Sequence, residues 1–170
     1  MGVLHRPSHQ WQSERSTADP DPYGWKGCGP HSVAMGVDAV SGGAVVPSGL
    51  EIRNLTNEAV PEAGDPGLIL PQLIAACRRF GMAWVDRTGQ PWAQAVADLR
   101  AHRWLVINVW YAALPDAYRS QASAAFGHSM GLMAVSGDGK SGLLYDPLAK
   151  AGRWVPLDVI RAAMEDWGVS

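Results

Sequence analysis

Cysteine is scarce in this sequence: Cys28 and Cys77 are the 2 cysteines among 170 residues. Two cysteines are too few for a disulfide framework, and they form no zinc site without neighbouring histidines. The one disulfide that they could form would join Cys28 to Cys77. We do not expect it, because Cys77 falls on the apolar side of a predicted helix, where free cysteines are often buried.

Long apolar runs and basic runs are also missing. No uninterrupted hydrophobic stretch reaches the length of a membrane span, and the segment Met1–Pro7 has no apolar core of signal-peptide length. Beyond the pair Arg78-Arg79 there is no Lys/Arg run, and the net charge is −2. These absences argue against nucleic acid or anionic lipid as the main partner. We expect a chain made in the cytoplasm without a signal peptide, or a module of a longer chain.

What is present is the composition of a globular domain, with 47% hydrophobic and 18% charged residues in 170. A chain of this length buries a substantial core in one domain. Residues 1–26 are polar and contain several prolines, so they predict an extended N-terminal arm. His5 and His9 lie in this arm and are expected at the surface, because a helix that would bring them together is disfavoured by the prolines.

The stretch from Gly27 to Met35 places Cys28 at the start of a helix. Pro30 suits a first helical turn, and Val33, Val37 and Val40 follow at the spacing of one helical face, which we expect to be buried. A thiol at a helix N-terminus meets unpaired backbone N–H groups and the positive end of the helix dipole, and both favour the thiolate. Cys28 is therefore a candidate nucleophile. The alternative is a buried structural cysteine.

Helical spacing and β-branched runs predict the remaining elements in two blocks. Residues 45–56 are ambiguous between strand and loop, and residues 82–85 suggest a brief strand. The other expected elements are helices over 71–80, 91–100 and 157–167 and strands over 104–110, 128–135, 141–145 and 153–155. Helices early and an antiparallel sheet late predict an α+β fold, with the cysteine-bearing helix packed on the sheet.

His128 and Asp146 stand at the two open ends of the predicted hairpin. If the loop is the three residues Gly137–Gly139, Asp146 falls opposite Met130 and on the same face as His128. A loop of two or four residues would place the two side chains on opposite faces. A histidine that a carboxylate orients is the base that a cysteine nucleophile requires. Taken singly, His128 could be an ordinary strand histidine, and Asp146 could begin an Asp-Pro turn.

The ordered set of these motifs resembles the papain-like cysteine peptidases of the bacteriocin-leader-processing (double-glycine peptidase-like) type. Related domains form the N-terminal peptidase module of phage endolysins. The residues that carry the resemblance are Cys28-Gly29-Pro30, Ser32, Ala34, Met35, Gly127, His128, Met130, Leu132 and Tyr145-Asp146-Pro147.

The resemblance implies a single papain-like peptidase domain over residues 27–170. We expect this domain to act as a monomer and to need no cofactor or metal. It implies that Cys28 is the nucleophile, that His128 is the general base and then acid, and that Asp146 orients the imidazole. For the substrate it favours peptides of bacterial peptidoglycan, cleaved at the cell wall as by an endolysin. Leader-peptide processing ranks second.

One departure weakens the expectation of catalysis. Such peptidases carry a glutamine a few residues before the cysteine, and its amide completes the oxyanion hole. Residues 23–27 contain none, so Gln12 is the nearer of two distant candidates. A non-catalytic papain-like binding domain is therefore a second hypothesis, and a metal-dependent hydrolase that uses His and Asp is a third.

His31 and the tryptophans have several interpretations. His31, three residues after Cys28, could bind a metal with it or tune the thiolate as a cation, but a partly exposed polar residue is expected in a first helical turn. Of the 8 tryptophans, Trp25 and Trp110 are the best candidates to line a substrate groove.

Overall fold

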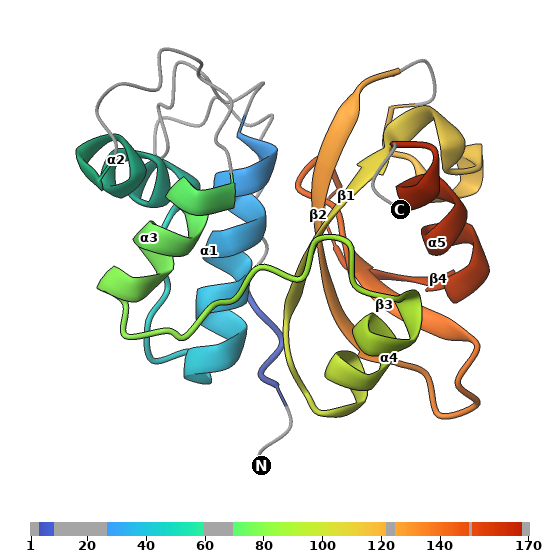
Figure 1. Cartoon of the computed structure of the whole chain (residues 1–170), viewed down its shortest axis with the longest axis horizontal. Helices are drawn as coiled ribbons and strands as arrows, with labels where there is room; N and C mark the ends of the chain where they lie inside the picture. Colours follow the sequence, from blue (N-terminus) through green and yellow to red (C-terminus); the bar gives the residue numbers. More distant parts are fainter. Residues whose placement is uncertain (1–3, 9–26, 60–69, 122–124, 150, 168–170) are drawn as a thin grey trace.

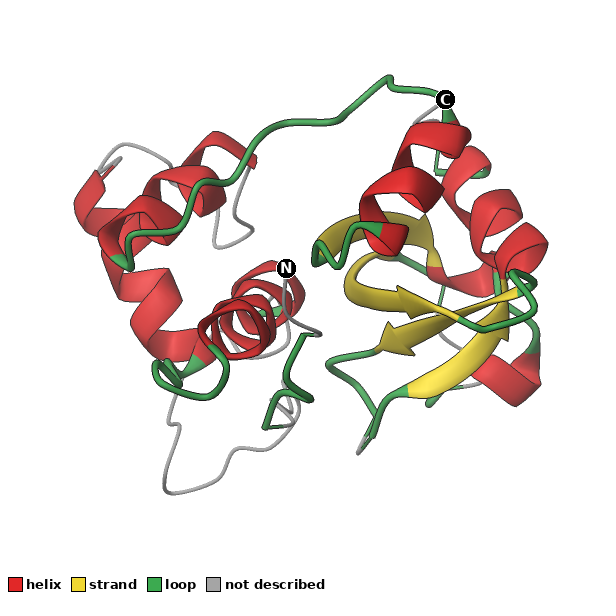
Figure 2. Cartoon of the chain, turned by 90° about the horizontal axis from the view of Figure 1, so that it is seen from below, coloured by secondary structure: helices red, strands yellow, loops and turns green. Residues whose placement is uncertain are grey.

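The computed structural model describes residues 4–8, 27–59, 70–121, 125–149 and 151–167. Three helices form one half of the molecule, and a sheet with two helices forms the other (Figures 1 and 2). The elements run in the order α1 (Cys28–Ser41), α2 (Gly49–Ala59), α3 (Leu70–Arg79), α4 (Trp92–Arg100), β1 (Leu105–Trp110), β2 (Gly127–Val135), β3 (Ser141–Tyr145), β4 (Arg153–Pro156) and α5 (Leu157–Glu165), with short 3-10 turns at Tyr111–Ala113 and Asp116–Tyr118.

The four strands form an antiparallel sheet in the order β1-β2-β3-β4, in which each strand pairs with its neighbour in the sequence. Helix α1 covers one face of this sheet, and α4 and α5 cover the other (Figure 1). The expected arrangement, a cysteine-bearing helix packed on a late antiparallel sheet, is what the structure contains. Residues 82–85 form no strand, so that expectation was wrong.

Helix α1 is the central helix of the molecule rather than an amphipathic surface helix. Every residue from Gly29 to Ala39 is buried, because α2 and α3 pack on one side of the helix and the sheet on the other. The prediction that Val40 belongs to the buried face was wrong, since its side chain is 45% exposed. The helix ends as expected at the glycine pair, where Gly42 adopts a left-handed conformation at the C-cap.

Helix α2 lies in the segment that the periodicity left ambiguous. Ser48 precedes it and accepts a hydrogen bond from the Glu51 backbone N–H through Oγ, at 3.0 Å. Ser48 and Glu51 stand at the spacing of a capping box, a sequence signal that identifies a helix start. This signal would have predicted the helix where hydrophobic periodicity did not.

The β2–β3 hairpin differs from the expectation in two ways that cancel. Ser136 N–H bonds to the carbonyl of Ser141 at 2.8 Å, so Gly137–Lys140 form the loop, one residue longer than predicted. A longer loop alone would turn Asp146 to the wrong face. However, a β-bulge lies at Met133, between Leu132 and Ala134.

The bulge restores the register beyond it. Gly131 pairs with Tyr145, which brings the next residue, Asp146, level with Met130 as predicted. The core packing reflects the same change of face, since Leu132 packs against the α5 side of the sheet and Met133 against the α1 side. His128 and Asp146 therefore share a face of the sheet because the bulge compensates for the extra residue of the loop.

Trp104 fills the closest approach between α1 and the sheet. A β-carbon on Gly36 of α1 would lie 2.6 Å from the Trp104 ring, and one on Gly131 of β2 would lie 2.0 Å from it. The indole is buried with Met35, Leu143 and Tyr145. The two glycines therefore provide the space that lets the helix dock on the strand.

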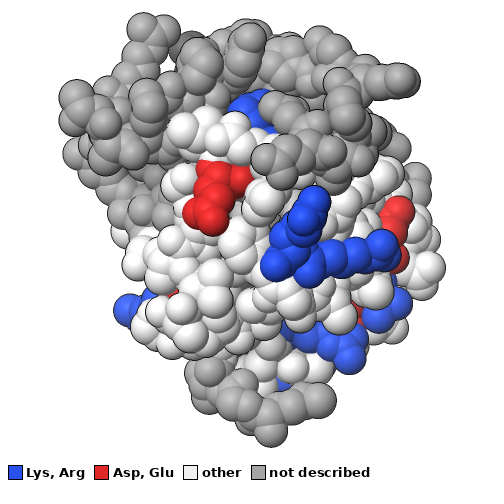
Figure 3. Space-filling model, turned by 90° about the vertical axis from the view of Figure 1, so that its left-hand side faces the viewer, with Lys and Arg blue, Asp and Glu red and all other residues white. Residues whose placement is uncertain are grey.

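Figure 3 shows the face of the molecule on the side of the helical half, where acidic and basic side chains form separate groups among uncharged surface. Arg78 and Arg79 occupy the last turn of α3, where positive charge complements the helix dipole. None of the described helices combines the length and the apolar character that crossing a bilayer requires.

Gly131→Ala tests the docking of α1. The added methyl group must displace the buried Trp104 ring, so we expect unfolding free energy to fall by about 3 kcal/mol, in the upper range for overpacking a core. The measurement is the urea midpoint at an unchanged slope. Gly137→Ala is the matched control, because no atom lies within 4 Å of its β-carbon position. Equal midpoints for the two variants would contradict this account of the interface.

Candidate active site

Cys28 is the first residue of α1, and its side chain is partly exposed. Gly27 precedes it as the N-cap, and the first turn of the helix contains no acidic residue. The positive end of the helix dipole is therefore not neutralised by a nearby carboxylate of the first turn, which leaves it to stabilise a thiolate. Both cysteines are free thiols, so the alternative of a Cys28–Cys77 disulfide is excluded.

His128 and Asp146 form a buried pair. His128 Nε2 lies 2.7 Å from Asp146 Oδ1, and the two residues are 2% and 1% exposed. Because Nε2 is hydrogen-bonded to Asp146, Nδ1 is the ring nitrogen of His128 that remains to interact with Cys28. Among the described residues Nδ1 makes no hydrogen bond that meets strict limits of distance and angle, and its interaction with the Cys28 thiol appears instead in the pKa shifts of both groups.

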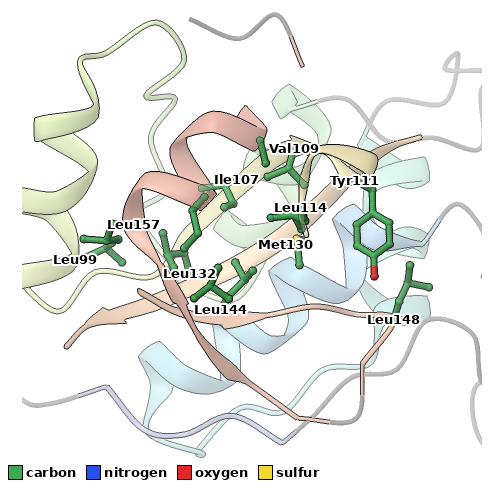
Figure 4. Close-up of a cluster of buried hydrophobic side chains, with 13 residues drawn as sticks. Leu99, Ile107, Val109, Tyr111, Leu114, Met130, Leu132, Leu144, Leu148 and Leu157 are labelled. Carbon is green, nitrogen blue, oxygen red and sulfur yellow. The ribbon is translucent and has the colours of Figure 1, made fainter. Parts of the chain in front are cut away.

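Asp146 receives further hydrogen bonds on both oxygens. The Leu148 backbone N–H donates to Oδ1 at 2.8 Å, and the Tyr111 hydroxyl donates to Oδ2 at 2.9 Å. The Ser120 hydroxyl also donates to Oδ2, at 3.3 Å. In Figure 4, the Tyr111 hydroxyl is directed toward Leu148, at the edge of the main hydrophobic cluster. These donors replace the water that a buried carboxylate loses.

A stacked pair of aromatic rings packs against the imidazole. The Tyr111 ring lies edge-on to His128 with centroids 4.9 Å apart, and Phe126 lies edge-on at 5.6 Å. Tyr111 and Phe126 also stack on each other. The rings exclude water from the His128–Asp146 hydrogen bond, and this strengthens it.

Ser129 connects α1 to the strand that carries His128. Its carbonyl accepts a hydrogen bond from Ser32 Oγ at 3.0 Å, and its own hydroxyl donates to Asn108 Oδ1 at 2.7 Å. The Ser129 backbone also forms a hydrogen bond that favours the Cys28 thiolate. This serine adjacent to His128 was not singled out from the sequence, because its partners come from distant segments.

The pKa shifts of Cys28 and His128 have opposite directions. Burial acts to raise the pKa of Cys28, but the side-chain interaction with His128 and its charge, followed by hydrogen bonding from the Ser129 backbone, lower it below its ordinary value. Burial acts to lower the pKa of His128, but the hydrogen bonds of Asp146 and Cys28 and their charges raise it to about 9. Near neutral pH these shifts favour a thiolate beside an imidazolium.

The carboxylate of Asp146 stays charged. Burial acts to raise its pKa, but the hydrogen bond and charge of His128, with the donors Leu148 and Tyr111, lower it. Cys77 shows the opposite behaviour, because burial without a charged partner raises its pKa to about 12. The two thiols of the chain therefore differ in their chemistry as well as in their exposure.

Four further candidates came from the sequence: Gln12, Trp25, Trp110 and His31. Gln12 and Trp25 lie outside the described residues. Trp110, at the end of β1, stacks on Trp167 at 5.9 Å. His31 is buried rather than partly exposed, so that expectation was wrong; α2, which the sequence analysis did not identify, packs against α1 there. In the described part of the chain, no three His, Cys, Asp or Glu residues form a group that could hold a metal.

Thiol labelling tests the thiolate. At pH 7 we expect iodoacetamide to modify Cys28 at least about 100-fold faster than Cys77, because alkylation requires the thiolate. The rates follow from mass spectrometry of the two cysteine peptides over a pH series. His128→Ala removes the interaction that lowers the pKa of Cys28, so its labelling should require higher pH. Labelling of Cys28 at the rate and pH dependence of an ordinary thiol would refute the ion pair.

Asp146→Asn tests the charge that holds His128. The His128 pKa is raised, so the imidazolium persists until the pH approaches about 9. Removing the carboxylate charge removes part of the cause, and the ring should lose its proton at lower pH. Ring-proton NMR across the alkaline range measures the shift. Asp138→Asn at the exposed hairpin loop is the control and should leave the titration unchanged; an unchanged titration in Asp146→Asn would disprove the assignment.

Comparison with known proteins agrees with this architecture. No family model and no curated protein sequence matches the chain. Among solved structures, a Bacillus anthracis protein described as a "putative C39-like peptidase" superposes with a TM-score of 0.65 at 17% sequence identity. The match covers 98% of this chain and 93% of that one. The chain thus has the α+β fold of that C39-like structure, with N-terminal helices packed on a four-stranded antiparallel sheet, as the sequence predicted.

Proposed function

We propose that the protein is a cysteine peptidase in which Cys28, His128 and Asp146 form the catalytic triad. The observation that carries this proposal is the chain of interactions from the Cys28 thiol through His128 to Asp146, with opposite pKa shifts in the first two groups. The fold of a C39-like peptidase supports it. We further propose that residues 27–170 form one catalytic domain preceded by an arm.

The reaction follows from these groups. The Cys28 thiolate attacks a peptide carbonyl carbon, so that a C–S bond forms and an electron pair moves to the carbonyl oxygen. The intermediate collapses with cleavage of the C–N bond, and the imidazolium of His128 gives its proton to the leaving amine. Neutral His128 then takes a proton from water, whose oxygen attacks the thioester. Cleavage of the C–S bond releases the acid and restores the thiolate.

The negative oxygen of the intermediate requires hydrogen-bond donors. The Cys28 backbone N–H is suited to this role, because the first N–H groups of a helix have no acceptor within it. The amide of Gln12 is our candidate for a second donor. For the substrate we propose the peptides of bacterial peptidoglycan, as in phage endolysins, with leader peptides as the alternative class.

Wild type and Cys28→Ala compared on purified bacterial cell walls test the proposal. We expect turbidity loss and release of new amino groups from the wild type, with both rates reduced at least about 10⁴-fold in the variant, because the covalent step is lost. Synthetic leader peptides, assayed in parallel, test the second substrate class.

Cys77→Ala is the matched control and should retain the activity, because Cys77 is buried in a hydrophobic cluster of the helical half and contributes no group to the proposed triad. Activity that survives in Cys28→Ala would exclude a thiol nucleophile. Loss of activity with a chelator would instead indicate a metal-dependent hydrolase. A wild type inactive on both substrates, but folded, would favour the binding-domain hypothesis.

A further inference from the structure

His31 forms a contact that the triad does not account for. Its Nδ1 lies 2.7 Å from the carbonyl oxygen of Gly27, and its backbone N–H donates to the same oxygen at 3.0 Å. A carbonyl oxygen only accepts hydrogen bonds, so Nδ1 must carry a hydrogen. One residue therefore holds the Gly27 carbonyl with two donors, in a site where the imidazole is 2% exposed.

The geometry of the peptide bond extends this constraint to Cys28. The Gly27 carbonyl and the Cys28 N–H belong to the same planar trans peptide, so they point in opposite directions. Fixing the carbonyl oxygen toward the body of α1 fixes the N–H toward the space beyond the helix N-terminus. That N–H is the donor that the oxyanion requires.

A second element is shaped to accept the imidazole. Gly49 is the first residue of α2, and a β-carbon there would lie 2.4 Å from Cε1 and 2.5 Å from Nδ1 of His31. Both distances are shorter than any normal contact, so any larger residue would push the ring away from its position. The absence of a side chain at Gly49 thus leaves the room in which His31 reaches Gly27.

We propose that His31 is a positioning residue of the oxyanion hole. It orients the Gly27–Cys28 peptide so that the Cys28 N–H meets the negative oxygen of the tetrahedral intermediate. The inference rests on the proposed function, and it assigns to His31 neither metal binding nor tuning of the thiolate.

This role predicts that two reactions of the Cys28 thiol depend on His31 and that a third does not. Peptide hydrolysis and the addition of an aldehyde to the thiol both create a tetrahedral oxyanion, so both require the oriented N–H. Alkylation by iodoacetamide displaces iodide at a saturated carbon and creates no oxyanion. A misoriented N–H therefore impairs the first two reactions and leaves the third nearly unchanged, because His128 and Ser129 lower the pKa of the thiol.

Three variants test the proposal. His31→Ala removes the side-chain donor, and Gly49→Ala displaces the ring without altering His31. His31→Asn keeps an N–H donor at the same distance along the side chain as Nδ1. For each variant we would measure cell-wall hydrolysis, binding of the dipeptide aldehyde acetyl-Ala-alaninal, iodoacetamide labelling of Cys28 and the urea midpoint.

We expect His31→Ala and Gly49→Ala to lose about 10- to 100-fold in kcat and in aldehyde affinity, the scale of losing one oriented donor. Cys28 labelling should stay within about twofold of wild type, and His31→Asn should recover most of the activity. Should His31→Ala fail to fold, Gly49→Ala and His31→Asn supply the same comparison.

Folded variants that hydrolyse at the wild-type rate would overturn the role of His31. Parallel losses of hydrolysis and labelling would also overturn it, because they would place the effect on the thiolate. A wild type that labels rapidly at Cys28 but neither hydrolyses nor binds the aldehyde would instead overturn the proposed function, and this inference with it.

Discussion

The buried carboxylate of Asp146 is the group on which the arrangement of the sheet half depends. Removing a carboxylate from water costs several kcal/mol unless the protein supplies charge and donors in its place. Here the positive charge comes from His128, and the donors come from Tyr111, Ser120 and Leu148. These residues belong to three separate segments. The charge at Asp146 therefore holds the loop after β1 and the turn after β3 against β2.

The two halves of the molecule supply different parts of the site. The helical half provides the sulfur and the first amides of α1, whereas the sheet half provides the imidazole and its carboxylate. Their relative position depends on Trp104, which occupies the space left by Gly36 and Gly131. The hydrogen bond from Ser32 to the Ser129 carbonyl fixes the end of the same interface nearest the thiol. Packing far from the sulfur thus determines the distance between the Cys28 thiol and the His128 ring.

Much of this arrangement could be predicted from the sequence, because glycine, proline and hydrophobic spacing mark most element boundaries. The helix that begins at Cys28 and the strand that carries His128 were recognisable in this way. The pairing of His128 with Asp146 was predicted from a three-residue hairpin loop, but the loop has four residues. The pairing still occurs because the bulge at Met133 compensates for the extra residue. A bulge depends on packing across strands, which hydrophobic alternation does not reveal. Tyr111 escaped notice for a similar reason, since its partner lies 35 residues away.

Two series of contacts lead to Cys28, one from each half of the molecule. On one side, Gly49 leaves room for His31, which holds the peptide that ends in the Cys28 N–H. On the other side, Tyr111 holds Asp146, which holds the ring of His128. In the proposed mechanism, the first series directs the Cys28 N–H at the oxyanion, and the second directs the His128 ring at the sulfur. Because the two series belong to different halves, the docking of α1 on the sheet brings the Cys28 N–H and thiol together with the His128 ring.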